Sequence, residues 1–246
     1  MQNPTTVSLS RMLTMQQAIE VTATNVANAN TPGYKAERLQ FSDWLTRQTG
    51  TLYPPGGNVI AATQLRATYR DQAEGAIAQT ANPLDVAIAG PGYFTVAAPN
   101  GPRLTRAGHF GLAPDGTIVD GSGNALLDTN GQPLQVGTAD AHIAVAADGT
   151  LSTENGQIGK IGIVQPQDPL RLTAEGNHLF NTTSPTDPVS GTRLVQGAIE
   201  QSNVEPVTEM TRLLTMQRQF QAAADLAQEE FTRQQSAIDQ IKPPVV

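Results

Sequence analysis

Nearly the same seven residues occur at both ends of this chain. Arg11-Met12-Leu13-Thr14-Met15-Gln16-Gln17 lies near the start and Arg212-Leu213-Leu214-Thr215-Met216-Gln217-Arg218 lies near the end. Each belongs to a segment whose apolar residues recur at helical spacing, which is typical of an amphipathic helix. Covering such a stripe is favourable by about 25 cal/mol per Å² of apolar surface. The repeat therefore predicts two terminal helices that meet each other, and it favours assembly over catalysis.

The first helix is predicted over residues 7–29. It ends near residues 28–33, because Pro32 disfavours the helical conformation of Thr31 and Gly33 accepts a left-handed turn. A helix of this length is marginal alone, so we expect it to order only against a partner. Its apolar seam alternates by three and four, as in a coiled coil, through Met12, Met15, Ile19, Thr22, Val26 and Ala29.

The second helix is predicted over residues 205–241, with Ser202-Asn203 as the capping pair and Pro243-Pro244 as the stop. It would span about 55 Å, against roughly 37 Å for the first helix even when that helix is extended to residue 31. Part of the longer stripe then stays uncovered within one molecule, so we expect other copies or related chains to cover it. The alternative is that both helices fold onto the central domain. The stripe contains Met210, Leu213, Met216, Phe220, Ala223, Ala224, Ala227, Phe231, Ile238 and Ile241.

The middle of the chain reads as antiparallel β-structure. Asp115-Gly116-Thr117 and Asp148-Gly149-Thr150 have the composition of hairpin turns. Short apolar or alternating runs bounded by turn residues predict strands at 85–89, 93–98, 109–112, 118–120, 143–146, 158–164 and 193–199. The predicted fold is α+β: long terminal helices paired as a coiled-coil-like domain, with an inserted antiparallel β-rich domain.

Four segments follow from these patterns. Residues 1–35 and 202–246 supply the helices of an assembly domain, and residues 82–201 form the β-rich domain. Residues 36–81 are a connector, with a short helix at 41–45 and a turn-rich stretch at 53–58.

Charge and composition exclude several classes of protein. The net charge is −7 and the chain has no dense run of Lys or Arg, which argues against nucleic acid as a partner. Lys35, Arg38 and Arg47 are expected to lie in solvent, so no membrane-binding patch is predicted. The sequence has no cysteine, shows no cleavable secretory signal and contains no run that could span a bilayer.

Catalytic signals are weak. His109, His142 and His178 have no metal-ligand spacing, and Asp115, Asp120 and Asp128 read as turn residues rather than calcium ligands. Gly90-Pro91-Gly92 lacks the Lys-Ser/Thr of a phosphate loop, and no nucleophile elbow is present. We predict no enzyme activity, no cofactor, no metal and no small-molecule substrate. A hydrolytic enzyme stays open only if a pocket gathers His109 or His178 with an acidic pair.

Several motifs along the chain occur in a recognisable series. Asn25-Val26-Ala27-Asn28-Ala29-Asn30-Thr31-Pro32-Gly33-Tyr34-Lys35 is similar to the signature that follows the N-terminal helix of bacterial flagellar rod and hook proteins. Thr105-Arg106-Ala107-Gly108, the segment at 84–94 and the segment at 196–204 resemble further landmarks in the expected order. The resemblance covers essentially the whole chain. Pro206 and Met210-Thr211 favour the proximal-rod type, with the distal-rod type as the alternative.

The resemblance implies a structural rod subunit that surrounds the export channel and transmits torque. Its partners would be other copies, other proximal-rod and distal-rod subunits and the flagellar type III export apparatus. Its location would be the periplasmic rod, reached without a cleaved signal. By the resemblance, the helices form the inner tube wall and the β domain lies outside them. A secreted β-rich adhesin remains the other reading from the residues alone.

Overall fold

The computed structural model of this chain describes residues 3–48, 58–137, 140, 142–189 and 191–241. The chain divides into two compact units. Unit 1 contains Met1–Ala27, Glu37–Tyr69 and Glu205–Val246, and unit 2 contains Asn28–Ala36 and Arg70–Val204. The fold is α+β, with two helices and a β-rich unit, as the sequence predicts.

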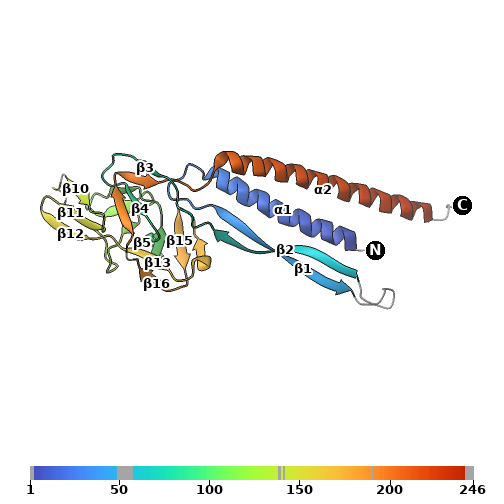
Figure 1. Ribbon diagram of the computed structural model, residues 1–246, viewed down its shortest axis with the longest axis horizontal. Helices are drawn as coiled ribbons and strands as arrows, with labels where there is room; N and C mark the ends of the chain where they lie inside the picture. The colour runs from blue at the N-terminus through green and yellow to red at the C-terminus, as the bar shows by residue number, and fades with distance from the viewer. Residues whose placement is uncertain (1–2, 49–57, 138–139, 141, 190, 242–246) are drawn as a thin grey trace. The chain divides into compact units, whose positions relative to one another are not determined.

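Unit 1 pairs two helices and carries a two-stranded sheet. Helices α1 (Asn3–Ala27) and α2 (Pro206–Ile241) contact each other and lie side by side with opposite chain directions (Figure 1). Strands β1 (Glu37–Gln48) and β2 (Asn58–Arg70) pair with each other. The short helix predicted at 41–45 is therefore wrong, because pairing with β2 outweighs the local preference of that segment. The stretch at 53–57 lies outside the described residues.

The start of β1 is fixed by the buried side chain of Asn25. Its Nδ2 donates to the carbonyl of Glu37 at 2.9 Å, and its Oδ1 accepts from the amide of Glu37 at 2.8 Å. The amide side chain thus satisfies both backbone groups of Glu37, as a neighbouring strand would. Asn25 is 1% exposed, so this pair of bonds is shielded from water.

The end of α1 and the start of α2 lie where the sequence predicts, but the cap of α2 differs from the expected one. α1 stops at Ala27, and the amide of Thr31 then bonds the carbonyl of Asn28 at 3.1 Å. α2 begins at Pro206, whose missing N–H costs nothing in the first turn. The expected cap at Ser202-Asn203 is wrong, since Glu205 precedes the helix and its Oε2 accepts from the hydroxyl of Thr208 at 2.9 Å. The predicted stop at Pro243-Pro244 lies outside the described residues.

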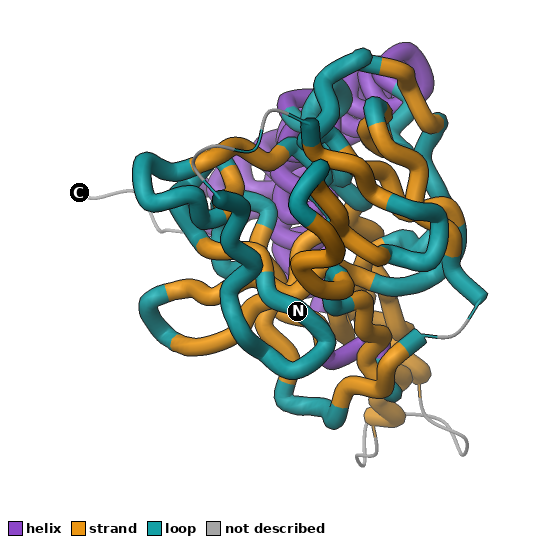
Figure 2. The backbone as a smooth tube through the Cα atoms, turned by 90° about the vertical axis from the view of Figure 1, so that its left-hand side faces the viewer, coloured by secondary structure: helices purple, strands orange, loops and turns teal. Residues whose placement is uncertain are grey.

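Unit 2 is built from short strands joined by many loops, as Figure 2 shows. The strands at 93–98 and 118–120 are confirmed residue for residue. Those expected at 158–164 and 193–199 are each split into two. The described strands of this unit are β3 (Ile77–Gln79), β4 (Val86–Ala89), β5 (Tyr93–Ala98), β6 (Gly101–Thr105), β7 (Phe110–Leu112), β8 (Ile118–Asp120), β9 (Ala125–Leu126), β10 (Ile143–Val145), β11 (Thr150–Thr153), β12 (Gly156–Lys160), β13 (Ile163–Pro166), β14 (Leu172–Ala174), β15 (Leu179–Thr182), β16 (Thr186–Pro188), β17 (Arg193–Gln196) and β18 (Ala198–Glu200), with a short 3-10 helix at Pro169–Arg171.

The pairing in unit 2 is antiparallel throughout its described strands, as predicted. The largest sheet follows the order β14-β15-β6-β5-β9-β8-β7, and β13 joins it by pairing with β5 and β16. Smaller sheets pair β10-β11-β12, β17-β4 and β18-β3. In the last two sheets, a strand from residues 193–200 pairs with a strand from residues 77–89, so the end of unit 2 is hydrogen-bonded to its beginning.

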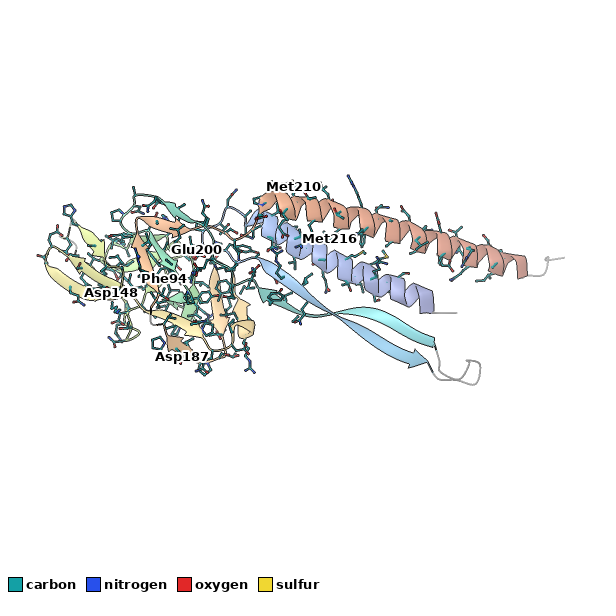
Figure 3. All side chains as sticks on the ribbon, viewed as in Figure 1. Phe94, Asp148, Asp187, Glu200, Met210 and Met216 are labelled. Atoms are coloured by element: carbon teal, nitrogen blue, oxygen red, sulfur yellow. The ribbon has the colours of Figure 1, made fainter. Side chains whose placement is uncertain are left out.

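The core of unit 2 is aliphatic with a few aromatic contacts. Phe94, labelled in Figure 3, lies among the strands and is fully buried, and its ring meets that of Phe110 edge-to-face with 5.2 Å between the centroids. A second cluster joins Tyr93 and Phe180, with ring centroids 5.8 Å apart. The main cluster includes Val86, Ile88, Val96, Ile118, Leu126, Leu134, Leu151, Ile161 and Leu194. Unit 2 therefore has a core of its own.

The two Asp-Gly-Thr turns are confirmed and have the same geometry. Gly116 and Gly149 have φ values of +82° and +91°, and the preceding Asp accepts a bond from the Thr amide at 3.0 Å and 3.1 Å respectively. These backbone bonds lower the pKa of Asp115 and Asp148, because they stabilise the charged carboxylate. The Asp residues thus serve as turn residues.

Among the described residues, neither helix is both long enough and apolar enough to cross a membrane.

Candidate assembly interface

The apolar stripes of α1 and α2 are only partly covered in one chain. Thr22, the polar member of the first stripe, is 4% exposed. Ala29 does not belong to this stripe, because α1 ends before it and it packs in unit 2 beside Tyr34, Ala36 and Val204. The predicted interface residues that are half-buried are Met12, Met15, Ile19, Val26, Leu213, Met216, Phe220, Ala224 and Ala227.

Three predicted interface residues on α2 remain exposed. Met210, Phe231 and Ile238 keep 52%, 54% and 56% of their surface in solvent. Figure 3 shows Met210 on the edge of α2 away from α1, whereas Met216 lies between the helices. Phe231 and Ile238 follow the stripe at helical spacing, but α2 has 36 residues and α1 only 25. The longer helix therefore carries apolar side chains that α1 leaves exposed.

A further set of exposed apolar side chains was not predicted. Leu13 and Leu214 hold the same place in the two similar heptapeptides, and they are 55% and 50% exposed. Their hydroxyl neighbours also match, since Thr14 and Thr215 each donate to the carbonyl four residues earlier. The two heptapeptides could have predicted this exposure, because the third residue of each lies outside the apolar seam that alternates by three and four. The other exposed members are Leu9, Val207 and Leu226.

A buried carboxylate ties α2 to β1 inside unit 1. Glu209 is 2% exposed, and its Oε1 accepts from Arg38 Nη1 at 2.6 Å and from Arg212 Nη1 at 3.3 Å. The expectation that Arg38 is solvated is therefore wrong, because its guanidinium has an anionic partner. Arg47 was expected in solvent as well, but its side chain lies outside the described residues.

The family motif after α1 is held by backbone geometry. Gly33 has a φ of +70°, and a Cβ at this position would come within 2.5 Å of the backbone carbon of Arg106. Only glycine fits such a close approach without displacing the neighbouring chain. Tyr34 is buried and its ring lies under Arg70, with 5.2 Å from the guanidinium carbon to the ring centroid.

The remaining motif residues are more open. Asn28 Oδ1 accepts from the hydroxyl of Thr31 at 3.3 Å, which closes the turn after the helix. Thr31 and Pro32 are half-buried and Asn30 is exposed. The seven predicted motif residues thus belong to two different units, since Asn25 lies in unit 1 and the other six lie in unit 2.

The residue after the motif belongs to a buried ionic cluster of Lys35, Arg106 and Glu200. Lys35 Nζ lies 2.7 Å from Glu200 Oε1, and Arg106 Nε pairs with Glu200 Oε2. All three side chains are at most 3% exposed. Burial lowers the pKa of Lys35, and its bond to Glu200 acts in the opposite direction. The expectation that Lys35 is solvated is wrong, because its partner lies 165 residues away in sequence.

Asn203 joins the same region of unit 2. Its Oδ1 accepts from the amide of Ala36 at 2.7 Å, and its Nδ2 donates to the carbonyls of Asp71 and Ala73 at 3.1 Å and 3.0 Å. This amide binds three backbone groups from two other segments, so it serves as a bridge rather than as the helix cap that its sequence position suggests.

The candidate catalytic residues are dispersed. His109 Nδ1, on an exposed side chain, lies 2.7 Å from Oδ1 of the buried Asp85. His142 bonds Glu154 through its backbone amide, and the carbonyl of His178 accepts from Thr105. Over the described ranges, no three or more His, Cys, Asp or Glu residues gather where a metal ion could bind. The best-organised features of the molecule are therefore the helix stripes and the buried ion pairs.

Comparison with known proteins identifies the class. Residues 6–35 match the family described as "Flagella basal body rod protein", residues 87–168 match "Flagellar hook protein FlgE/F/G D1 domain", and residues 195–240 match "Flagellar basal body rod FlgEFG protein C-terminal". These are the rod and hook proteins of the bacterial flagellum.

Full-length relatives show the same family. The chain is 32% identical over 243 residues to the flagellar basal-body rod protein FlgF of Caulobacter vibrioides, covering 98% of each chain. It is 32% identical to FlgF of Mesorhizobium japonicum, covering 97% of each. It is also 32% identical to the rod protein FlgG of Agrobacterium fabrum, covering 87% of this chain and 90% of the relative. This chain belongs to the flagellar basal-body rod protein family, as its motifs indicated.

Proposed function

We propose that this chain is a structural subunit of the proximal flagellar rod, built into the shaft through its two terminal helices. The observation that carries the proposal is the incomplete cover of α2, where Met210, Phe231 and Ile238 are at least half exposed. Neighbouring subunits would bury these side chains. The half-buried seam of α1 and α2 would then pack as a coiled-coil-like pair inside a shared helical wall.

The remaining predicted interface residues have a double role in this proposal. Met12, Met15, Ile19 and Val26 face the seam of the same chain and still keep part of their surface for a neighbour, as do Leu213, Met216, Phe220, Ala224 and Ala227. Repetition of one such contact by a rotation and a rise that never closes gives a tube. The β-rich unit would space and lock adjacent copies.

The proximal type is supported by coverage. The FlgF relatives of Caulobacter vibrioides and Mesorhizobium japonicum span 97–98% of this chain, the FlgG relative of Agrobacterium fabrum spans 87%, and further FlgF relatives span 84–89%. The partners would be other copies, other proximal-rod subunits and distal-rod FlgG. Export through the flagellar type III apparatus, without a cleaved signal, would deliver the subunit to the periplasmic part of the basal body. No enzyme activity, cofactor, nucleic-acid partner or membrane insertion belongs to this role.

The test replaces Leu213 or Phe220 with Asp, which puts a charge into the seam, and uses Asp115→Ala as a turn control. Isolated basal bodies should lack the Leu213→Asp and Phe220→Asp chains and should retain the Asp115→Ala chain. Loss of the control alone, with normal incorporation of both seam variants, contradicts assembly through the helices.

A deletion separates this role from that of a secreted adhesin. An adhesin would keep its function without residues 1–33 and 204–246, since unit 2 has its own core. A rod subunit loses incorporation when either helix is removed.

A further inference from the structure

The chain passes between its two units four times, after Ala27, Ala36, Tyr69 and Val204. Inside unit 2, three segments that end at these passages are bonded to one another: residues 33–36, 70–76 and 200–204. The amide of Gly33 donates to the carbonyl of Glu200 at 2.8 Å, and the amide of Asp71 donates to the carbonyl of Ala36 at 2.8 Å. Unit 2 therefore holds together the segment that follows α1 and the segment that precedes α2.

One carboxylate is central to this arrangement. Glu200, labelled in Figure 3, accepts from Lys35 Nζ at 2.7 Å and from the amide of Gly75 at 2.9 Å, so it bonds a group from each of the other two segments. Lys35 Nζ also donates to the carbonyl of Ala73 at 2.7 Å. The other carboxylate oxygen pairs with Arg106, whose Nη2 donates to the carbonyl of Gly90 at 2.7 Å. The cluster thus fastens the three segments to the body of the β-rich unit.

Apolar packing alone does not hold these segments. Among the described residues, the buried apolar cluster beside them is small and consists of Tyr34, Ala36 and Val204, with Ala29 at its edge. The ionic cluster, in contrast, has two cations, Lys35 and Arg106, and one anion, Glu200, all buried. Removal of the anion leaves the two buried cations with backbone carbonyls but without the carboxylate that neutralises them, and buried charges of that kind are strongly destabilising. The junction therefore depends on Glu200.

We propose that Lys35, Arg106 and Glu200 are positioning residues for assembly: by fastening the segments next to α1 and α2, they favour pairing of the two helices. This inference rests on the proposed function, in which the helix pair is the part that enters the rod. If the junction opened completely, a loop of about 180 residues would join the ends of α1 and α2, and with the junction closed the effective loop is about 12 residues. Loop-closure entropy then favours pairing by up to about 60-fold.

The natural absence of cysteine allows a direct measurement. Spin labels on Gln17→Cys and Arg218→Cys, both exposed positions on the two helices, report the distance between α1 and α2 in the monomeric full-length chain. The parent chain should give one narrow distance distribution. Glu200→Gln keeps the shape of the side chain and removes its charge, so its distribution should broaden and the paired fraction should fall.

A stability control separates positioning from general destabilisation. Val96→Ala removes core volume at a fully buried site in the main cluster of unit 2 and leaves the ionic cluster intact. It should lower the stability of unit 2 and keep the narrow distribution. If Glu200→Gln stays narrow, or if Val96→Ala broadens equally, the inference is overturned. If Glu200→Gln does not fold, Lys35→Met decides in the same assay, where a broad distribution supports the inference and a narrow one overturns it.

The proposed function fails by a different readout. If the Leu213→Asp chain is incorporated into basal bodies normally, the helices do not drive assembly, whatever the distance distributions show. If Leu213→Asp is excluded and Glu200→Gln keeps paired helices, the rod function stands and the positioning role is wrong.

Discussion

Phe231 and Phe220 lie on the same face of α2 and allow assembly to be separated from folding. Phe220 is half-buried against its own chain, whereas Phe231 keeps 54% of its surface exposed. Full burial of such a side chain is worth about 1.5–3 kcal/mol, so a neighbouring subunit that covers the exposed half of Phe231 gains about 1 kcal/mol per contact. Phe231→Ala should then weaken each contact by about fivefold.

The same substitution should barely affect the monomer. Truncation of an exposed side chain changes the free energy of unfolding by about 0.5 kcal/mol or less, whereas Phe220→Ala should cost about 2 kcal/mol. Urea unfolding followed by helix circular dichroism measures the free energy of unfolding of the monomer. Inducible expression in a strain without its own copy of the protein measures the strength of the contact between subunits, as the dose of protein that restores swimming.

Phe231→Ala should need about fivefold more protein than the parent chain, and the neighbouring exposed Gln235→Ala should need no more. The reasoning is refuted if Phe231→Ala destabilises the monomer as much as Phe220→Ala does. It is equally refuted if Phe231→Ala swims at the dose of the parent chain.

Three further substitutions test the local structure. Gly33→Ala should lower the free energy of unfolding of unit 2 by at least about 2 kcal/mol, because the new Cβ overlaps the backbone of Arg106 and an L side chain disfavours the left-handed φ. Gly131 has the same kind of φ but open space around it, so Gly131→Ala should cost about 1 kcal/mol. Thermal or urea unfolding measures both values. Arg38→Met should destabilise unit 1 by about 2 kcal/mol, because it removes the shorter ion pair of the buried Glu209. Arg212 is more exposed, so Arg212→Met should destabilise unit 1 by less than about 0.5 kcal/mol. Equal losses of stability for the two variants would contradict this reasoning. Backbone bonds lower the pKa of Asp128 below 3.8, so the stabilisation from its carboxylate is complete above that pH and is lost as the pH falls through the lowered pKa. Asp128→Asn should flatten this acid dependence in a pH series of unfolding midpoints. An unchanged slope would show that the carboxylate contributes nothing.

The sequence predicts those parts of the fold that depend on short-range patterns. The end of α1 before Pro32, the start of α2 at Pro206 and the two Asp-Gly-Thr turns follow from residue chemistry within a few positions. The unequal helix lengths are also a local property, and they led directly to the exposed Phe231 and Ile238.

Elements fixed by distant partners could not be predicted. β3, at Ile77–Gln79 inside the predicted connector, is only three residues long and forms because it pairs with the distant β18, where Ile77 lies opposite Glu200. The segment at 41–45 resembles a short helix until β2 pairs with it. Lys35 looks like a solvated charge because its partner Glu200 stands at the other end of the chain. In each case the deciding contact spans too many residues for a local pattern to show it.

Amide hydrogen exchange over residues 231–238 of α2 tests the central claim most directly. In the isolated chain these amides should exchange quickly, because the apolar side chains Phe231 and Ile238 are exposed and few contacts hold the turns around them. In purified basal bodies the same amides should be strongly protected, since neighbouring subunits bury the stripe. Equal exchange in the isolated chain and in the rod would show that these helices find no partner there, and it would contradict assembly through them.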